Sequence, residues 1–176
     1  MDAARVNVFC NGFPKSGTHA LQKAVRSIGV PADVNHRTYA EGLPEGTTHN
    51  VFIKRDPRNV VVSWLRWGQQ QVTPGSFLAA FRKFQDGPLV NEMAQFEPWL
   101  AEAHVVRFED LIANDSALRG IAHWIGVPYI EGAWEGLPNH TMTWNDEPSD
   151  YRPLWPQVMT AWYAEGGGEL LSRWGY

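Results

Sequence analysis

Short apolar stretches alternate along this chain with longer segments in which apolar residues recur at helical spacing. Four such stretches cover residues 6–9, 30–35, 48–54 and 104–108. Their length, and the Gly, Pro, Asn and Asp residues that bound them, are typical of buried strands. The pattern therefore predicts four strands, with helical segments after the first and the third and a loop over residues 36–50 between the second and the third.

The predicted helices have recognisable starts and stops. The first covers residues 18–28, and Gly29 is well placed to end it. The second covers residues 57–68, because Asp56 is a good N-cap and Pro57 suits a first helical turn. Further helices are predicted over 76–85, 89–103, 116–125 and 156–174, the last of them broken or frayed at 166–168.

This alternation predicts an α/β fold in three layers, with a central parallel sheet flanked by helices. With 176 residues, no internal repeat and no long linker, the chain is expected to form a single domain over residues 1–176. Ligands of such folds bind beyond the C-terminal ends of the strands. The glycine-rich segment after the first predicted strand and Arg55 after the third both lie at such ends.

The composition narrows the class of protein. It is typical of a soluble globular protein, with 44% hydrophobic and 19% charged residues, and the net charge of −4 argues against a dedicated nucleic-acid binder. The single cysteine, Cys10, excludes an intrachain disulfide and a Cys-rich metal site. No apolar run reaches the ~18 residues of a membrane span, and no signal peptide is recognisable. A cytoplasmic protein without a membrane anchor is therefore expected.

Residues 11–18, Asn-Gly-Phe-Pro-Lys-Ser-Gly-Thr, join the first predicted strand to the first helix. A strand, a glycine loop and a helix N-terminus together form an anion site, because loop N–H groups converge and the helix dipole adds about half a positive charge. Lys15, Ser16 and Thr18 supply the side chains that bind phosphate or sulfate. The alternative is an ordinary strand-to-helix turn with a capping hydroxyl. Lys15 precedes Gly17 by two residues, whereas a Walker A loop places Lys directly after its second Gly, which disfavours an ATPase or GTPase.

Two segments resemble the donor-binding motifs of sulfotransferases that use 3′-phosphoadenosine 5′-phosphosulfate (PAPS). Residues 13–18, Phe-Pro-Lys-Ser-Gly-Thr, resemble the 5′-phosphosulfate loop. Residues 55–63, Arg-Asp-Pro-Arg-Asn-Val-Val-Val-Ser, resemble the 3′-phosphate signature with its Arg and Ser. A third, weaker segment at 107–111, Arg-Phe-Glu-Asp-Leu, is similar to the family's Tyr-Glu-Asp-Leu, and residues 149–176 look like the end of some bacterial and viral members.

The resemblance implies a P-loop-like fold and transfer of a sulfuryl group from PAPS to a hydroxyl or amine. The product nucleotide is 3′,5′-adenosine bisphosphate (PAP), the acceptor is a small molecule or a saccharide, and no metal is required. Lys15 holds the bridging oxygen and stabilises the charge that develops on the leaving phosphate. The implied donor site comprises Lys15, Ser16, Gly17, Thr18, His19, Arg55 and Ser63.

An acceptor hydroxyl needs a general base, which typically contributes ~10²- to 10⁴-fold to the rate. In cytosolic members of the family, a His after the second strand has this role, and His36 stands where that base is expected. The alternative for His36 is a surface loop histidine. Glu41 is a second candidate base, since some branches use Glu, whereas His49 lies at a strand start on the far side of the sheet.

The chain departs from the family pattern at three points. Ala20 stands where cytosolic members carry the Trp that stacks on adenine, which leaves Trp144 or Phe108 as candidate platforms. No Arg-Lys-Gly loop is recognisable, and Arg152 or Arg58 are the candidate substitutes. The chain is also shorter than typical members, so its acceptor-binding segments are expected to be reduced.

Two other hypotheses stand beside the sulfotransferase. One is a P-loop-type nucleotide or small-molecule kinase, which needs an Asp at a strand end to hold Mg²⁺. The other is a nucleotide-binding protein that has lost catalysis. Lys15 and His36 favour an enzyme, whereas the missing Trp and Arg-Lys-Gly loop favour binding alone. The sequence does not indicate the acceptor or the oligomeric state.

Overall fold

The computed structural model describes residues 6–135 and 149–176. These residues divide into two compact units. Of the described residues, 6–54 and 98–135 belong to the first unit, and 55–97 and 149–176 belong to the second. The single domain expected over residues 1–176 stays a prediction.

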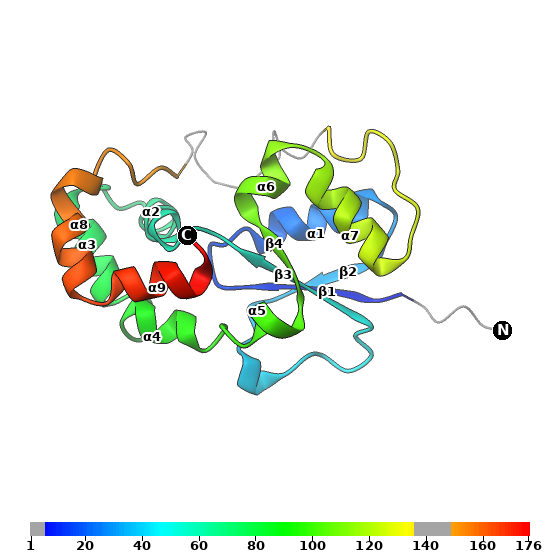
Figure 1. Cartoon of the computed structure of the whole chain (residues 1–176), viewed down its shortest axis with the longest axis horizontal. Coiled ribbons are helices and arrows are strands. Elements are labelled where there is room, and N and C mark those ends of the chain that lie inside the picture. The colour runs from blue at the N-terminus through cyan, green and yellow to red at the C-terminus, as the bar shows by residue number, and fades with distance from the viewer. Residues whose placement is uncertain (1–5, 136–148) are drawn as a thin grey trace. The chain divides into compact units, whose positions relative to one another are not determined.

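The first unit is built on a four-stranded sheet in which every strand runs parallel to its neighbours (Figure 1). The strands lie in the order β2-β1-β3-β4. Their bounds are β1 Val8–Gly12, β2 Ala32–Val34, β3 His49–Lys54 and β4 His104–Arg107. The four predicted strands and the α/β class are confirmed. Because β1 lies in the interior of the sheet, the loop that follows it starts from the middle of the sheet's C-terminal edge.

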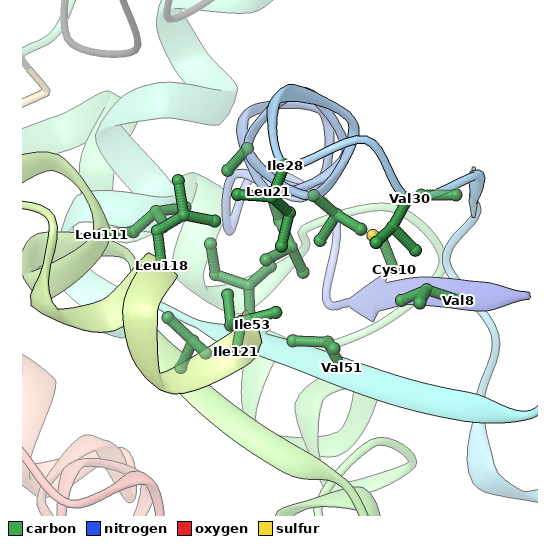
Figure 2. Close-up of a cluster of buried hydrophobic side chains, with 14 of the residues drawn as sticks. Val8, Cys10, Leu21, Ile28, Val30, Val51, Ile53, Leu111, Leu118 and Ile121 are labelled. Atoms are coloured by element: carbon green, nitrogen blue, oxygen red, sulfur yellow. The ribbon is translucent and has the colours of Figure 1, made fainter. Parts of the chain in front are cut away.

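Three helices cover one face of this sheet. They are α1 Thr18–Ser27, α6 Phe108–Ala113 and α7 Ser116–Ile125. Alternate residues of β1 and β3, among them Cys10 and Ile53, are buried in one cluster with Leu21 of α1 and Ile121 of α7 (Figure 2). Burial raises the pKa of the Cys10 thiol to about 12, so Cys10 is an inert core residue.

The opposite face is covered by the short helix α5 Trp99–Glu102 and by the loop that carries the 3₁₀ helix η1 Tyr39–Glu41. Trp99 is buried, and its Nε1 donates a hydrogen bond of 3.0 Å to the carbonyl oxygen of Arg37. The side chain of Asn11 in β1 donates to the same oxygen. Helix, sheet and loop thus form the layered arrangement that the sequence predicts.

The second unit is helical. Its helices are α2 Pro57–Trp67, α3 Pro74–Arg82, α4 Leu89–Ala94, α8 Trp155–Ala164 and α9 Gly167–Trp174. Its core includes Phe81 of α3, whose ring stacks on the fully buried Trp162 of α8 at 4.1 Å. The predicted break near 166–168 is confirmed, since Gly166 takes a φ of +88° and a Cβ at Gly167 would overlap the Trp162 ring.

Two element predictions differ from the structure. The single helix predicted over residues 89–103 is wrong, because α4 ends at Ala94 and α5 starts anew after Pro98. Proline has no N–H and restricts the residue before it, so a helix does not run through this position. Residues 108–113 form α6, a helix that the apolar pattern did not indicate. Within the described residues, no helix has both the length and the apolar character needed to cross a bilayer.

Candidate functional site

The loop between β1 and α1 contains a tight turn. The N–H of Ser16 donates to the carbonyl oxygen of Phe13 at 3.0 Å, which places Pro14 and Lys15 at the two central positions. Lys15 has a φ of +68°. A Pro at the second position and a positive φ at the third are the features of a type II turn, whose third position favours Gly or Asn. Lys15 therefore occupies a conformation that costs a non-glycine residue roughly 1–2 kcal/mol.

Strained backbone of this kind clusters at functional sites, where a side chain is held in place against its conformational preference. Lys15 is half-buried, and burial lowers the pKa of its ammonium from the ordinary value of 10.5. The N-cap of α1 is Gly17, which has no side-chain acceptor for the N–H groups of the first helical turn. The loop thus combines a cation with the positive end of a helix.

The hydroxyl of Ser16 is the strongest sign of a ligand in this loop. Ser16 is fully buried, and its Oγ has no hydrogen-bond partner among the described residues. A buried hydroxyl without a partner costs roughly 1–3 kcal/mol. An oxygen of a bound anion would accept its hydrogen, and the neighbouring Thr18, which is also buried, begins α1. The residues present therefore fit a phosphate or sulfate group.

Gly17 is held against the first residue of α6. Its φ is +102°, and a Cβ added there would lie 2.8 Å from Cε2 of Phe108 and closer still to Cδ2. Phe108 is buried in the core cluster with an exposed fraction of 7%. Phe108 is therefore a support beneath the loop, and its proposed role as an open platform for adenine is wrong. The other candidate platform, Trp144, lies outside the described residues.

The structure brings His36 to this loop. Its Nδ1 lies 2.8 Å from the carbonyl oxygen of Gly12. Because a carbonyl only accepts hydrogen bonds, Nδ1 carries the proton in the neutral ring, and the lone pair is on Nε2. Burial lowers the pKa of His36 below its ordinary 6.5, and the nearby His19 and Lys15 lower it further, although the bond to Gly12 acts in the opposite direction. A neutral imidazole with an unprotonated Nε2 is the form that a general base requires.

The pH dependence of His36 follows from this arrangement. We expect its pKa in the folded protein to lie below 6.5. When the pKa of His36 is lower in the folded than in the unfolded protein, the stabilising contribution of the neutral side chain is fully present above pH ~6.5. This contribution to the free energy of unfolding is lost as the pH falls through the pKa of the folded protein. A ring NMR titration, assigned with a His36→Gln variant, measures the pKa and shows which nitrogen carries the proton. A pKa above 6.5, or a proton on Nε2 in the neutral ring, would contradict the expectation.

Asn11 is a positioning residue that sequence reasoning missed. It is fully buried in β1, and its Oδ1 accepts hydrogen bonds from the N–H groups of Gly12 at 2.9 Å and Arg37 at 3.0 Å. Its Nδ2 donates to the carbonyl oxygen of Arg37 at 3.0 Å. One amide therefore ties the start of the loop to the residue after His36. The feature of the sequence that could have identified Asn11 is that a polar residue stands in an apolar strand, directly before a glycine.

The other candidates in the first unit are less suited to catalysis. Glu41 accepts hydrogen bonds from the N–H and hydroxyl of Thr38, which lower its pKa and make its carboxylate a weaker base. His19 is an exposed residue in the first turn of α1, beside the loop. His49 begins β3 and packs edge-on against Trp124. It therefore lies at the N-terminal end of the strand, far from the loop between β1 and α1, as the sequence predicts.

The second phosphate motif lies in the second unit. Arg55 and Ser63 are both buried polar residues, with exposed fractions of 5% and 9%. Ser63 lies on the buried face of α2, whose predicted cap is confirmed because Asp56 accepts a hydrogen bond from the N–H of Arg58. A buried guanidinium and a buried hydroxyl in the same unit are residue types that fit an anion site.

The two candidate substitutes for the Arg-Lys-Gly loop already carry carboxylate partners. Arg58 forms an ion pair of 2.7 Å with Asp56, and its guanidinium lies 4.0 Å from the ring centre of Tyr151. Arg152 forms an ion pair of 2.8 Å with Asp150 and is largely exposed. These contacts give both arginines a structural role in the second unit.

No protein-family model matches the chain, and no curated protein is significantly similar to it. In residues 6–135 and 149–176, no group of three or more His, Cys, Asp and Glu side chains is arranged to hold a metal ion. The function is therefore inferred from the residues of the loop and their geometry.

Proposed function

We propose that this protein is a sulfotransferase that transfers the sulfuryl group of PAPS to a hydroxyl or amine of a small-molecule or saccharide acceptor. The observation that carries the proposal is the loop itself. Lys15 occupies a turn position that favours Gly, directly before a fully buried Ser16 whose hydroxyl has no partner among the described residues. The segment 13–18 in which both lie resembles the 5′-phosphosulfate loop of this family.

Each end of the donor has its own candidate residues. In this proposal, the N–H groups of Lys15 and Gly17, the hydroxyls of Ser16 and Thr18 and the N-terminus of α1 bind the 5′-phosphosulfate. Arg55 and Ser63 bind the 3′-phosphate, for which a guanidinium is suited because its N–H groups form charge-assisted, often bidentate hydrogen bonds with phosphate. His19 lies beside the loop and completes the set.

The proposed reaction is a direct displacement at sulfur. The acceptor oxygen or nitrogen attacks the sulfur while the bond from sulfur to the bridging oxygen of the 5′-phosphate breaks, and PAP leaves with the electron pair. Lys15 and the loop amides stabilise the charge on the leaving phosphate, as in phosphoryl transfer. Nε2 of His36 takes the acceptor's proton, which the neutral tautomer set by the Gly12 carbonyl permits.

A calorimetric titration tests the donor assignment. PAP is expected to bind more tightly than ATP with Mg²⁺, and Arg55→Ala is expected to weaken PAP binding about 10- to 100-fold, because charge-assisted hydrogen bonds contribute roughly 1.5–3 kcal/mol. Arg82→Ala is the matched control, since Arg82 is an exposed arginine of the same unit that pairs with Glu165. PAP binding should be unchanged in this control.

The alternatives predict different results. A preference for ATP with Mg²⁺ would favour the kinase and contradict the proposal. If the protein bound PAP tightly but showed no Lys15-dependent turnover of PAPS, it would be a nucleotide-binding protein without catalytic activity. Unaltered PAP affinity in Arg55→Ala would remove Arg55 from the donor site.

A further inference from the structure

Two cations stand opposite each other at the C-terminal end of β3 and β4. The parallel register pairs Lys54, the last residue of β3, with Arg107, the last residue of β4. Burial lowers the pKa of Lys54, and the charge of Arg107 lowers it further, while Glu109 and Asp110 act in the opposite direction. The pair thus places two positive charges, with Glu109 and Asp110 nearby, at the edge of the sheet where α/β proteins bind ligands.

A cavity of about 640 Å³ opens beside this pair. That volume lies within the range of about 300–1,000 Å³ typical of small-molecule sites. Its walls are Lys54, the whole of β4, Asp110 of α6, the first half of α7 and the loop that joins these two helices. The residues are Lys54, His104, Val105, Val106, Arg107, Asp110, Asn114, Ser116, Ala117 and Gly120. No residue of the loop between β1 and α1 is among them.

The charges of this cavity favour an anion. Lys54 and Arg107 are cationic, whereas Asp110 is the one carboxylate among the lining residues. Burial lowers the pKa of His104, which keeps its imidazole largely neutral at pH 7. The hydroxyl of Ser116 and the side-chain amide of Asn114, whose Oδ1 caps the N–H of Ser116, provide polar contacts on the opposite wall. At Gly120 an added Cβ would meet no atom within 4 Å, so this part of the wall is open.

We propose that this cavity binds a small organic anion whose carboxylate, sulfate or phosphate group lies between Lys54 and Arg107. An anionic group there forms charge-assisted interactions with both cations. The remainder of the ligand contacts the polar wall formed by Asn114 and Ser116. The site is separate from the proposed donor loop, and the inference does not depend on the sulfotransferase proposal.

Thermal unfolding of the full chain with added anions tests the proposal. Citrate, sulfate and phosphate are titrated at constant ionic strength against sodium chloride. Each anion that binds the cavity should raise the Tm of the unaltered protein, and its apparent affinity should fall at least tenfold in Lys54→Met and in Arg107→Met. Lys23→Met is the matched control, because Lys23 is an exposed lysine of α1 in the same unit, and it should retain the full response.

Two further measurements separate this cavity from the donor loop. The part of the anion response that depends on Lys54 should persist in Lys15→Met, where the loop lacks its cation. PAP binding, where present, should be unchanged in Lys54→Met. A response to citrate alone would identify a carboxylate ligand, and a response to sulfate or phosphate would identify a tetrahedral oxyanion.

Three results would overturn the proposal. The first is an anion response in Lys54→Met equal to that in Lys23→Met. The second is a Tm of the unaltered protein that no anion raises above the chloride control. The third is loss of PAP binding in Lys54→Met, which would assign Lys54 to the donor site. Failure of the unaltered protein to bind PAP would contradict the sulfotransferase proposal alone, and the Lys54-dependent response would remain.

Discussion

Replacing Lys15 by Gly or by Ala is expected to lower PAPS turnover roughly 10²- to 10³-fold, the usual effect of removing one group that stabilises a developing negative charge. The two variants should nevertheless differ in stability. Both lack the ammonium, but only Ala keeps a Cβ at a φ of +68°. The Gly variant should therefore have the larger free energy of unfolding, by about 1 kcal/mol. Denaturant unfolding and PAPS turnover measure the two effects.

The comparison of the Gly variant with the Ala variant separates the effect of backbone strain on stability from the effect of losing the positive charge. A Lys15→Arg variant adds the converse control, because it retains both the positive charge and the strained backbone. Equal free energies of unfolding for the Gly and Ala variants would show that the turn relaxes when the lysine is removed. Undiminished PAPS turnover in either variant would show that the side chain of Lys15 has no part in the reaction.

Gly17→Ala is expected to lower the free energy of unfolding by about 2 to 5 kcal/mol. The left-handed backbone conformation contributes roughly 1–2 kcal/mol, and forcing a methyl group into a packed core contributes roughly 1–3 kcal/mol. The obstruction is the buried ring of Phe108, which lies under the loop. Because the ring cannot move without disturbing the core cluster, the loop should shift, and binding of PAP should be lost as well. Denaturant unfolding measures the first effect and calorimetry the second.

The matched control for this prediction is Gly46→Ala. Gly46 has a φ of +77° in the same unit, and a Cβ there would meet no atom within 4 Å. It should therefore show the conformational contribution alone. A second variant that combines Gly17→Ala with Phe108→Leu should recover part of the stability. If Gly17→Ala were no more destabilising than Gly46→Ala, the close contact with Phe108 would not contribute.

Local signals in the sequence predicted most of the elements. The strand, glycine loop and helix from β1 to α1 follow from apolar periodicity and from the position of Gly29, and Asp56 caps α2 as its residue type indicates. These features depend on neighbours within one or two turns, so a single sequence carries them. The prediction of one helix over 89–103 was wrong because it followed the apolar pattern through Pro98, where proline interrupts the helical backbone whatever the pattern.

What the sequence determined by itself was therefore the order of strands and helices and the set of residues in the loop, with Lys15, Ser16 and Gly17 among them. The tertiary structure decided the strained turn at Lys15, the approach of His36 to the Gly12 carbonyl and the bridging role of Asn11. It also decided the pairing of Lys54 with Arg107. The physical reason is that strand register and loop packing bring together residues that lie far apart in the chain. A periodic pattern of apolar residues specifies which face of an element is buried, but it does not specify which distant residues that face contacts.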